Sequence, residues 1–75
     1  MNTYNALITL LNESRKTSDL IKQVRELPDN YILVDCNFAR AARLHVVGNK
    51  VYIEADEELK SKLERLINKL IKQGR

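Results

Sequence analysis

The sequence is poor in the residues that cross-link or anchor a small chain. It contains one cysteine and one histidine among 75 residues. A single cysteine excludes an internal disulfide, and the absence of a Cys/His cluster excludes a zinc site of the usual spacing. No apolar stretch approaches the roughly 20 residues of a membrane-spanning helix, and no basic segment followed by an apolar run indicates a signal peptide. We therefore expect a cytoplasmic protein with no membrane partner.

The chain also lacks the groups that catalysis needs. It shows no paired carboxylates, no nucleophile beside a base and no metal-ligand spacing. Cys36 falls on the predicted core side of a strand, which favours a buried apolar cysteine over a nucleophile. The pair His45 and Tyr52 has no second acid or metal beside it. We predict a non-enzymatic protein with no cofactor and no small-molecule substrate.

Length and charge suggest how such a chain is stabilised and what it binds. No repeat or Gly/Ser linker divides it, so residues 1–75 form a single domain. A domain of this size hides only about 60% of the surface that its unfolded chain exposes. Its core is thin, and we expect a homo-oligomer. The 13 basic and 10 acidic residues give a net charge of +3, which permits a nucleic-acid partner without requiring one.

The strongest local signal is a β-hairpin centred on Gly48-Asn49. Glycine in the first position is typical of a type II′ turn, whose first central residue needs a positive φ. Counting outward pairs His45 with Tyr52, and the alternation of side chains then separates two faces. The apolar face is Leu44, Val46, Val51 and Ile53, and the polar face is Arg43, His45, Lys50, Tyr52 and Glu54.

A third strand and a C-terminal helix flank this hairpin. The strand covers residues 31–36 after a turn at residues 28–30, with Ile32, Val34 and Cys36 toward the core and Tyr31, Leu33 and Asp35 opposite. The helix begins at the capping residue Asp56. Its apolar stripe, which can cover its own sheet or pack against a partner helix, is Leu59, Leu63, Leu66, Ile67, Leu70 and Ile71.

The N-terminal part of the chain is less clearly patterned. Residues 18–27 show helical spacing of Leu20, Ile21, Val24 and Leu27, with a cap at Thr17 or Ser18 and a stop before Pro28. Residues 5–11 fit either a helical stripe or a short buried strand, and the pattern leaves both open.

The segment "LVDCNFARAARLHVV" resembles the RemA family, bacterial regulators of extracellular-matrix genes. The family pattern L-[IV]-D-A-T-x-G-R-R-T-R-A-V-I-I is matched or nearly matched at Leu33, Val34, Asp35, Arg40, Arg43, Val46 and Val47. The family's N-R-I-I-[AT]-I-V strand also resembles "NALITLL", and the strand that precedes it in the family is missing here. The resemblance implies that residues 5–11 form a strand, that the element order is β-α-β-β-β-α, and that subunits form rings presenting basic residues to DNA.

This chain departs from the family at positions that matter for DNA. Alanine stands at 6 and 41, where the family has basic residues, and at 39 and 42, where it has glycine and threonine. Two of the three basic positions that the family uses on DNA are therefore absent. The resemblance thus supports the fold and the assembly more strongly than DNA binding.

Two sets of candidate site residues follow. Arg40 and Arg43, three residues apart, are predicted to contact DNA phosphates, and Arg15 and Lys16 lie in a loop before the helix expected at Ser18, where free N–H groups suit an anion. The competing interpretation pairs Arg43 with Glu54 and leaves Arg40 solvated. Apolar surface left uncovered on the sheet predicts an interface, formed by Tyr31, Leu33, His45 and Tyr52.

Two functions are compatible with these residues. The first is a small α+β, oligomeric DNA-binding protein for transcription regulation, contacting the phosphate backbone. The second is a ring-forming or dimeric protein-interaction module without nucleic-acid binding, which the alanines at 6 and 41 favour.

Overall fold

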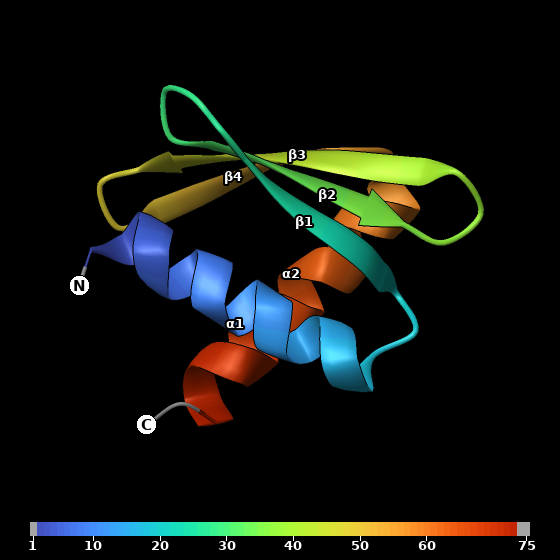
Figure 1. Ribbon diagram of the computed structural model, residues 1–75. Coiled ribbons are helices and arrows are strands. Elements are labelled where there is room, and N and C mark those ends of the chain that lie inside the picture. The colour runs from blue at the N-terminus through green and yellow to red at the C-terminus, as the bar shows by residue number, and fades with distance from the viewer. Residues whose placement is uncertain (1, 74–75) are drawn as a thin grey trace.

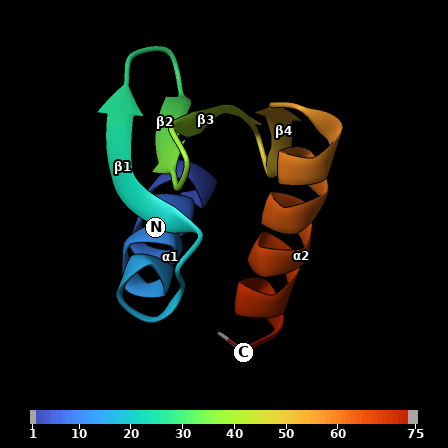
Figure 2. The same cartoon turned by 90° about the vertical axis from the view of Figure 1, so that its right-hand side faces the viewer.

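A four-stranded sheet forms one layer of the molecule, and two helices lie together on one of its faces (Figures 1 and 2). The computed structural model describes residues 2–73, with side chains described up to residue 69. The elements are α1 (Thr3–Thr17), β1 (Ile21–Leu27), β2 (Tyr31–Cys36), β3 (Arg40–Val47), β4 (Lys50–Glu54) and α2 (Glu57–Gln73). The predicted α+β class, the antiparallel strands and the C-terminal helix are confirmed.

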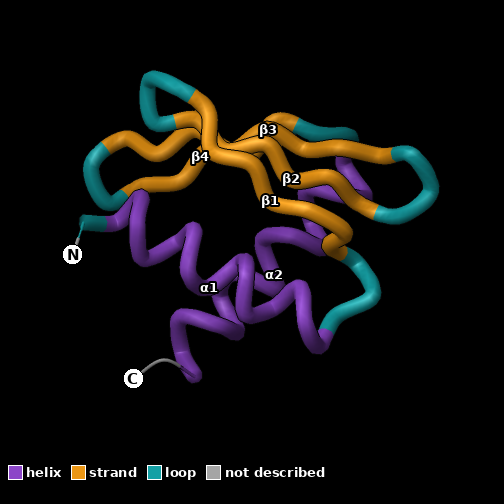
Figure 3. Tube along the Cα trace, in the orientation of Figure 1, coloured by secondary structure: helices purple, strands orange, loops and turns teal. Residues whose placement is uncertain are grey.

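The sheet is an antiparallel meander in the order β1-β2-β3-β4, with short turns between neighbouring strands (Figure 3). The register predicted for the β3–β4 hairpin is confirmed, because Val46 pairs with Val51 and His45 pairs with Tyr52. Gly48 has a φ of +63°. A positive φ at this position is what the predicted type II′ turn requires, and it explains the glycine.

Alternation along β2 and β3 places every second side chain in the core. Ile32, Val34 and Leu44 are fully buried, and the helices contribute Leu7, Leu11, Leu59, Leu63 and Ile67. The predicted inward faces of β2 and the hairpin are confirmed, with Val51 and Ile53 half-buried against the core. The α2 stripe is confirmed up to Ile67, whereas the side chains of Leu70 and Ile71 lie outside the described residues.

Two expectations for the N-terminal third are wrong. Residues 21–27 form strand β1 instead of a helix, and residues 5–11 belong to helix α1 instead of the strand that the RemA resemblance implies. The element order is therefore α-β-β-β-β-α. The misleading helical spacing in β1 comes from a β-bulge between Ile21 and Gln23, which shifts the alternation of the strand by one residue. The inward residues Ile21 and Val24 are consequently three apart, which is the spacing of a helix.

Helix α1 follows the stripe that the pattern left open. Leu7 and Leu11 are buried one turn apart, and Tyr4 and Ile8 pack beside them. The side-chain oxygen of Asn2 accepts a hydrogen bond from the Asn5 N–H at 2.8 Å and caps the helix. Tyr4 ties the first turn to the sheet, because its hydroxyl donates to the carbonyl of Tyr31 at 2.8 Å.

Candidate functional site

The face of the sheet opposite the helices is the candidate site. In the part of the chain that the structure describes, no element covers it (Figure 2). We call it the open face. It is formed by the outward residues of the four strands, which are Gln23, Arg25, Leu27, Tyr31, Leu33, Asp35, Ala41, Arg43, His45, Val47, Lys50, Tyr52 and Glu54.

The strand register arranges the centre of the open face in two rows that cross all four strands. The first, which we call the aromatic row, pairs Leu27 with Tyr31, Tyr31 with His45, and His45 with Tyr52. The second, the charged row, contains Arg25, Leu33, Arg43 and Glu54 in the same strand order. Residues directly opposite on neighbouring strands are in side-chain contact distance, so each row is a continuous strip.

Two rings of the aromatic row are stacked on each other. The centroids of Tyr31 and His45 lie 4.1 Å apart, and their planes differ by 3°. The guanidinium carbon of Arg43 lies 5.1 Å from the Tyr31 centroid, within cation–π range. Tyr52 is 53% exposed at the edge of the row. These contacts hold the rings in place although no helix covers them.

The charged row is balanced within the chain. Arg43 donates through Nη2 to Glu54 Oε1 at 2.6 Å, as the competing interpretation expected. The Nε of Arg25 lies 3.1 Å from Asp35 Oδ2 on the neighbouring strand. The hydrogen bond to Glu54 raises the pKa of the Arg43 guanidinium. The arginines of the open face therefore have carboxylate partners, and the face has a mixed charge.

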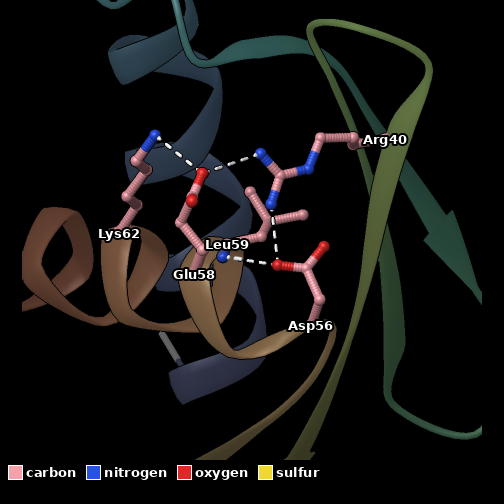
Figure 4. A network of polar contacts seen from close by, with 5 residues as sticks. All are labelled: Arg40, Asp56, Glu58, Leu59 and Lys62. Carbon is pink, nitrogen blue, oxygen red and sulfur yellow. Dashed lines mark hydrogen bonds and ion pairs between the residues drawn. The ribbon is translucent and has the colours of Figure 1, made fainter.

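Arg40 belongs to the other side of the sheet. Its side chain reaches the start of α2, where Nη2 donates to Asp56 Oδ1 at 2.7 Å and Nη1 donates to Glu58 Oε1 at 3.2 Å (Figure 4). Asp56 also accepts a hydrogen bond from the Leu59 N–H at 2.9 Å, which makes it the cap of α2 as predicted. Glu58 lies 3.4 Å from Lys62 Nζ. Arg40 thus joins β3 to the first turn of α2.

The carboxylates around Arg40 are held in their charged form. The Leu59 N–H and then Arg40 lower the pKa of Asp56, and Arg40 and then Lys62 lower the pKa of Glu58. Hydrogen bonds to a charged carboxylate favour that form over the protonated one. Arg40 would have to leave two charged partners in order to contact a phosphate.

The structure does not bring the predicted nucleic-acid residues to one surface. Arg40 and Arg43 are an odd number of residues apart in the same strand, so their side chains point to opposite faces. Arg15 and Lys16 lie in the last turn of α1, and Lys16 Nζ is 3.7 Å from Glu13 Oε2. The helix N-terminus expected at Ser18 is absent, because a strand follows there.

The four predicted interface residues do come together. Tyr31, Leu33, His45 and Tyr52 all lie on the open face, on three adjacent strands. Sequence reasoning missed Arg25 and Leu27, because their segment was assigned to a helix. The bulge at Ile21–Gln23 concealed their alternation, although "VREL" followed by Pro-Asp-Asn resembles a strand entering a turn.

The structure offers no reactive thiol, metal centre or membrane-spanning helix among the residues that it describes. Cys36 is buried with 2% exposure, and burial raises the pKa of its thiol. Among the described residues, no group of three or more His, Cys, Asp or Glu side chains is placed to hold a metal ion. Over the same residues, neither helix is long and apolar enough to cross a membrane.

No protein-family model, curated protein or solved structure matches the chain. The resemblance to the RemA family therefore stays a prediction. The strand that it implies over residues 5–11 is wrong.

Proposed function

We propose that this protein is a non-enzymatic protein-interaction domain that binds its partner through the open face of the sheet. The observation that carries the proposal is the aromatic row, in which Leu27 on β1 and rings on β2, β3 and β4 form one strip without a covering helix. Tyrosine is enriched at protein interfaces because its ring is large, rigid and amphipathic.

The arrangement of the rings favours a protein partner over unpaired nucleobases. A base-stacking platform needs free ring faces. Tyr31 and His45 already cover one face of each other, and Arg43 lies over the Tyr31 ring. The ion pairs of Arg25 and Arg43 give the surrounding face both charge signs, which suits the polar surround of a protein interface.

Site-specific photocrosslinking in the native cells tests this proposal. A photoreactive phenylalanine analogue replaces Tyr52 on the open face, and in a matched control it replaces Glu13, whose exposed side chain lies on α1. We expect protein adducts from position 52 and few or none from position 13. Equal yields from both positions, or adducts to nucleic acid alone, would contradict the proposal.

A second candidate function is binding to the DNA phosphate backbone, as in the regulator of RemA type. One observation favours it: a shallow hollow beside the β2–β3 turn is lined by Lys22, Arg25 and Arg40 against a single carboxylate, Asp35. Cations that outnumber the carboxylates of a hollow attract an anion, although Arg25 and Arg40 are already paired with carboxylates within the chain. The net charge of +3 is compatible with such a partner.

DNA titrations over a range of salt concentrations test the second candidate. Each lost phosphate contact lowers the slope of log K against log salt by about 0.9. If the cations of this hollow contact phosphates, the Lys22→Ala, Arg25→Ala double variant should lower the slope by nearly 2 per bound subunit, equally for all DNA sequences. An unchanged slope, or no binding of the parent protein at low salt, would exclude this candidate.

A further inference from the structure

We infer that the partner on the open face is a second copy of this chain, docked face to face with its strands aligned to those of the first copy. The two-fold axis runs along the strands, between β2 and β3. This inference rests on the proposed function, and it names the partner and the residues that meet. It follows from the order of residues within the two rows.

A two-fold axis along the strands reverses the order of the strands in the second copy. It leaves each row at the same position along the strand direction, so each row faces its own copy. β1 of one copy then faces β4 of the other, and β2 faces β3. In the aromatic row, Tyr31 meets the second copy's His45, and Leu27 meets the second copy's Tyr52. The stacked Tyr31–His45 pair therefore lies at the axis and packs against its own symmetry mate.

The charged row is self-complementary under the same operation. Arg25 lies on β1 and Glu54 lies on β4, at the two ends of the row. Reversal places Arg25 of each copy opposite Glu54 of the other, which gives two new ion pairs from one contact. Between them, Leu33 meets the aliphatic part of the second copy's Arg43. An isologous interface requires such self-complementarity.

Sheet geometry is compatible with this docking. Both sheets twist in the same hand, so aligned sheets follow one another at a nearly constant separation of about 10 Å. Neighbouring strands lie about 4.8 Å apart and rise about 3.3 Å per residue, so the open face of each copy covers roughly 400 Å² in projection. This is about half the area per partner of a standard protein interface, so we expect a weak dimer.

Sedimentation of two charge-reversal variants tests the inference directly. In Arg25→Glu alone, two glutamates face each other at each end of the charged row, and in Glu54→Arg alone, two arginines do. We expect each variant to dimerise at least tenfold more weakly than the wild type, because like charges are then opposed twice per dimer. Mixing the two variants restores both pairings, so the mixture should dimerise with about the affinity of the wild type.

The mixture separates loss of the interface from loss of the fold. Within one chain Arg25 pairs with Asp35, and Glu54 pairs with Arg43. Circular dichroism therefore follows whether each variant keeps its fold. A misfolded variant would not be rescued by mixing. Glu13→Arg and Lys16→Glu serve as matched controls, because they reverse exposed charges on α1 and should leave dimerisation unchanged.

A wild type that remains monomeric up to about 1 mM overturns the inference, because even weak specific contacts would then be visible. A dimer whose two variants fail to rescue each other also overturns it. The proposed function is judged separately by the proteins that position 52 captures. Adducts to this chain agree with both proposals, and adducts to a different protein alone support only the proposed function.

Discussion

The two faces of the sheet are built from alternate residues of the same strands, and they differ in almost every property. The covered face is aliphatic, and Ile32, Val34 and Leu44 have no exposed surface. The open face carries stacked rings and ion pairs, and Tyr52 and Val47 remain about half exposed at 53% and 49%. One backbone thus serves two environments.

This difference assigns stability and binding to different residues. Burial fixes the side chains of the covered face, and their removal leaves cavities. Neighbours on adjacent strands fix the side chains of the open face, as in the Tyr31–His45 stack. Changes on the open face should therefore alter association with little effect on folding, and changes on the covered face should do the reverse.

The largest expected difference between the faces is in thiol reactivity. Cys36 on the covered face should react with a disulfide reagent at least about 1,000-fold more slowly than a cysteine introduced by Tyr52→Cys in a Cys36→Ala background. Burial both shields the Cys36 thiol and raises its pKa. The rate of colour release from the reagent measures the ratio. Similar rates would mean that the helices do not cover this face in solution.

The second-largest difference is expected in the free energy of unfolding when one side chain from each face is truncated to alanine. Leu44→Ala removes a fully buried side chain and should lower the free energy of unfolding by about 2–5 kcal/mol. Tyr52→Ala, from the open face, should lower it by less than about 1 kcal/mol. Urea denaturation under conditions where the protein is monomeric measures both. Equal losses would remove the distinction between the two faces.

The two arginines of β3 should respond differently because they lie on different faces. Arg40→Gln removes the ion pairs that join β3 to the start of α2, whereas Arg43→Gln removes one ion pair within the hairpin. We expect Arg40→Gln to lower the melting temperature more than Arg43→Gln does. Calorimetry of the two variants measures the order, and the reverse order would count against the structural role of Arg40.

The same contacts predict an acid limb of stability. The pKa values of Asp56 and Glu58 are lower in the folded protein than in the unfolded chain. Their contribution is therefore fully present above about pH 4.5 and is lost as the pH falls through the lowered values. The Arg40→Gln variant should therefore lose less stability on acidification than the wild type. Glu58 accounts for most of this difference, because Arg40 is the main cause of its lowered pKa. Melting curves at pH 7 and about pH 3 test this.

The smallest effect is expected in the β2–β3 turn, which belongs to neither face. Phe38 and Ala39 adopt positive φ values of 66° and 56°, which side chains disfavour. Ala39→Gly should stabilise the protein by up to about 1 kcal/mol and leave dimerisation unchanged. Asn30→Gly at φ 65° is the control, and it should gain less because asparagine tolerates this conformation. Urea denaturation compares the two, and a larger gain at Asn30 would contradict the prediction.

The parts of the fold that sequence reasoning predicted correctly are those with a local marker. Gly48 determines the hairpin register, and Asp56 with its acidic first turn marks α2. Strand β1 was missed because the bulge after Ile21 gives a strand the spacing of a helix. A bulge depends on pairing with β2, which is a tertiary feature without a local signal at these residues.

The candidate site divides in the same way. The four residues predicted to form an interface do lie on one face, because alternation within the hairpin and β2 places them there. Arg40 and Arg43 were treated as one basic connection, because the sequence did not show that β3 begins at Arg40. Once both lie in a strand, alternation separates them, and Asp56 and Glu58 become the partners of Arg40.

The three tyrosines report whether this protein associates through the open face. Tyr31 and Tyr52 lie on the open face. Tyr4 lies on α1, on the covered side of the sheet, where its hydroxyl donates a hydrogen bond to the Tyr31 carbonyl. Their ring proton resonances are to be followed by NMR as the protein is diluted. We predict concentration-dependent shifts for Tyr31 and Tyr52 and constant positions for Tyr4. Shifts for Tyr4 alone, or for none of the three, would contradict association through the open face.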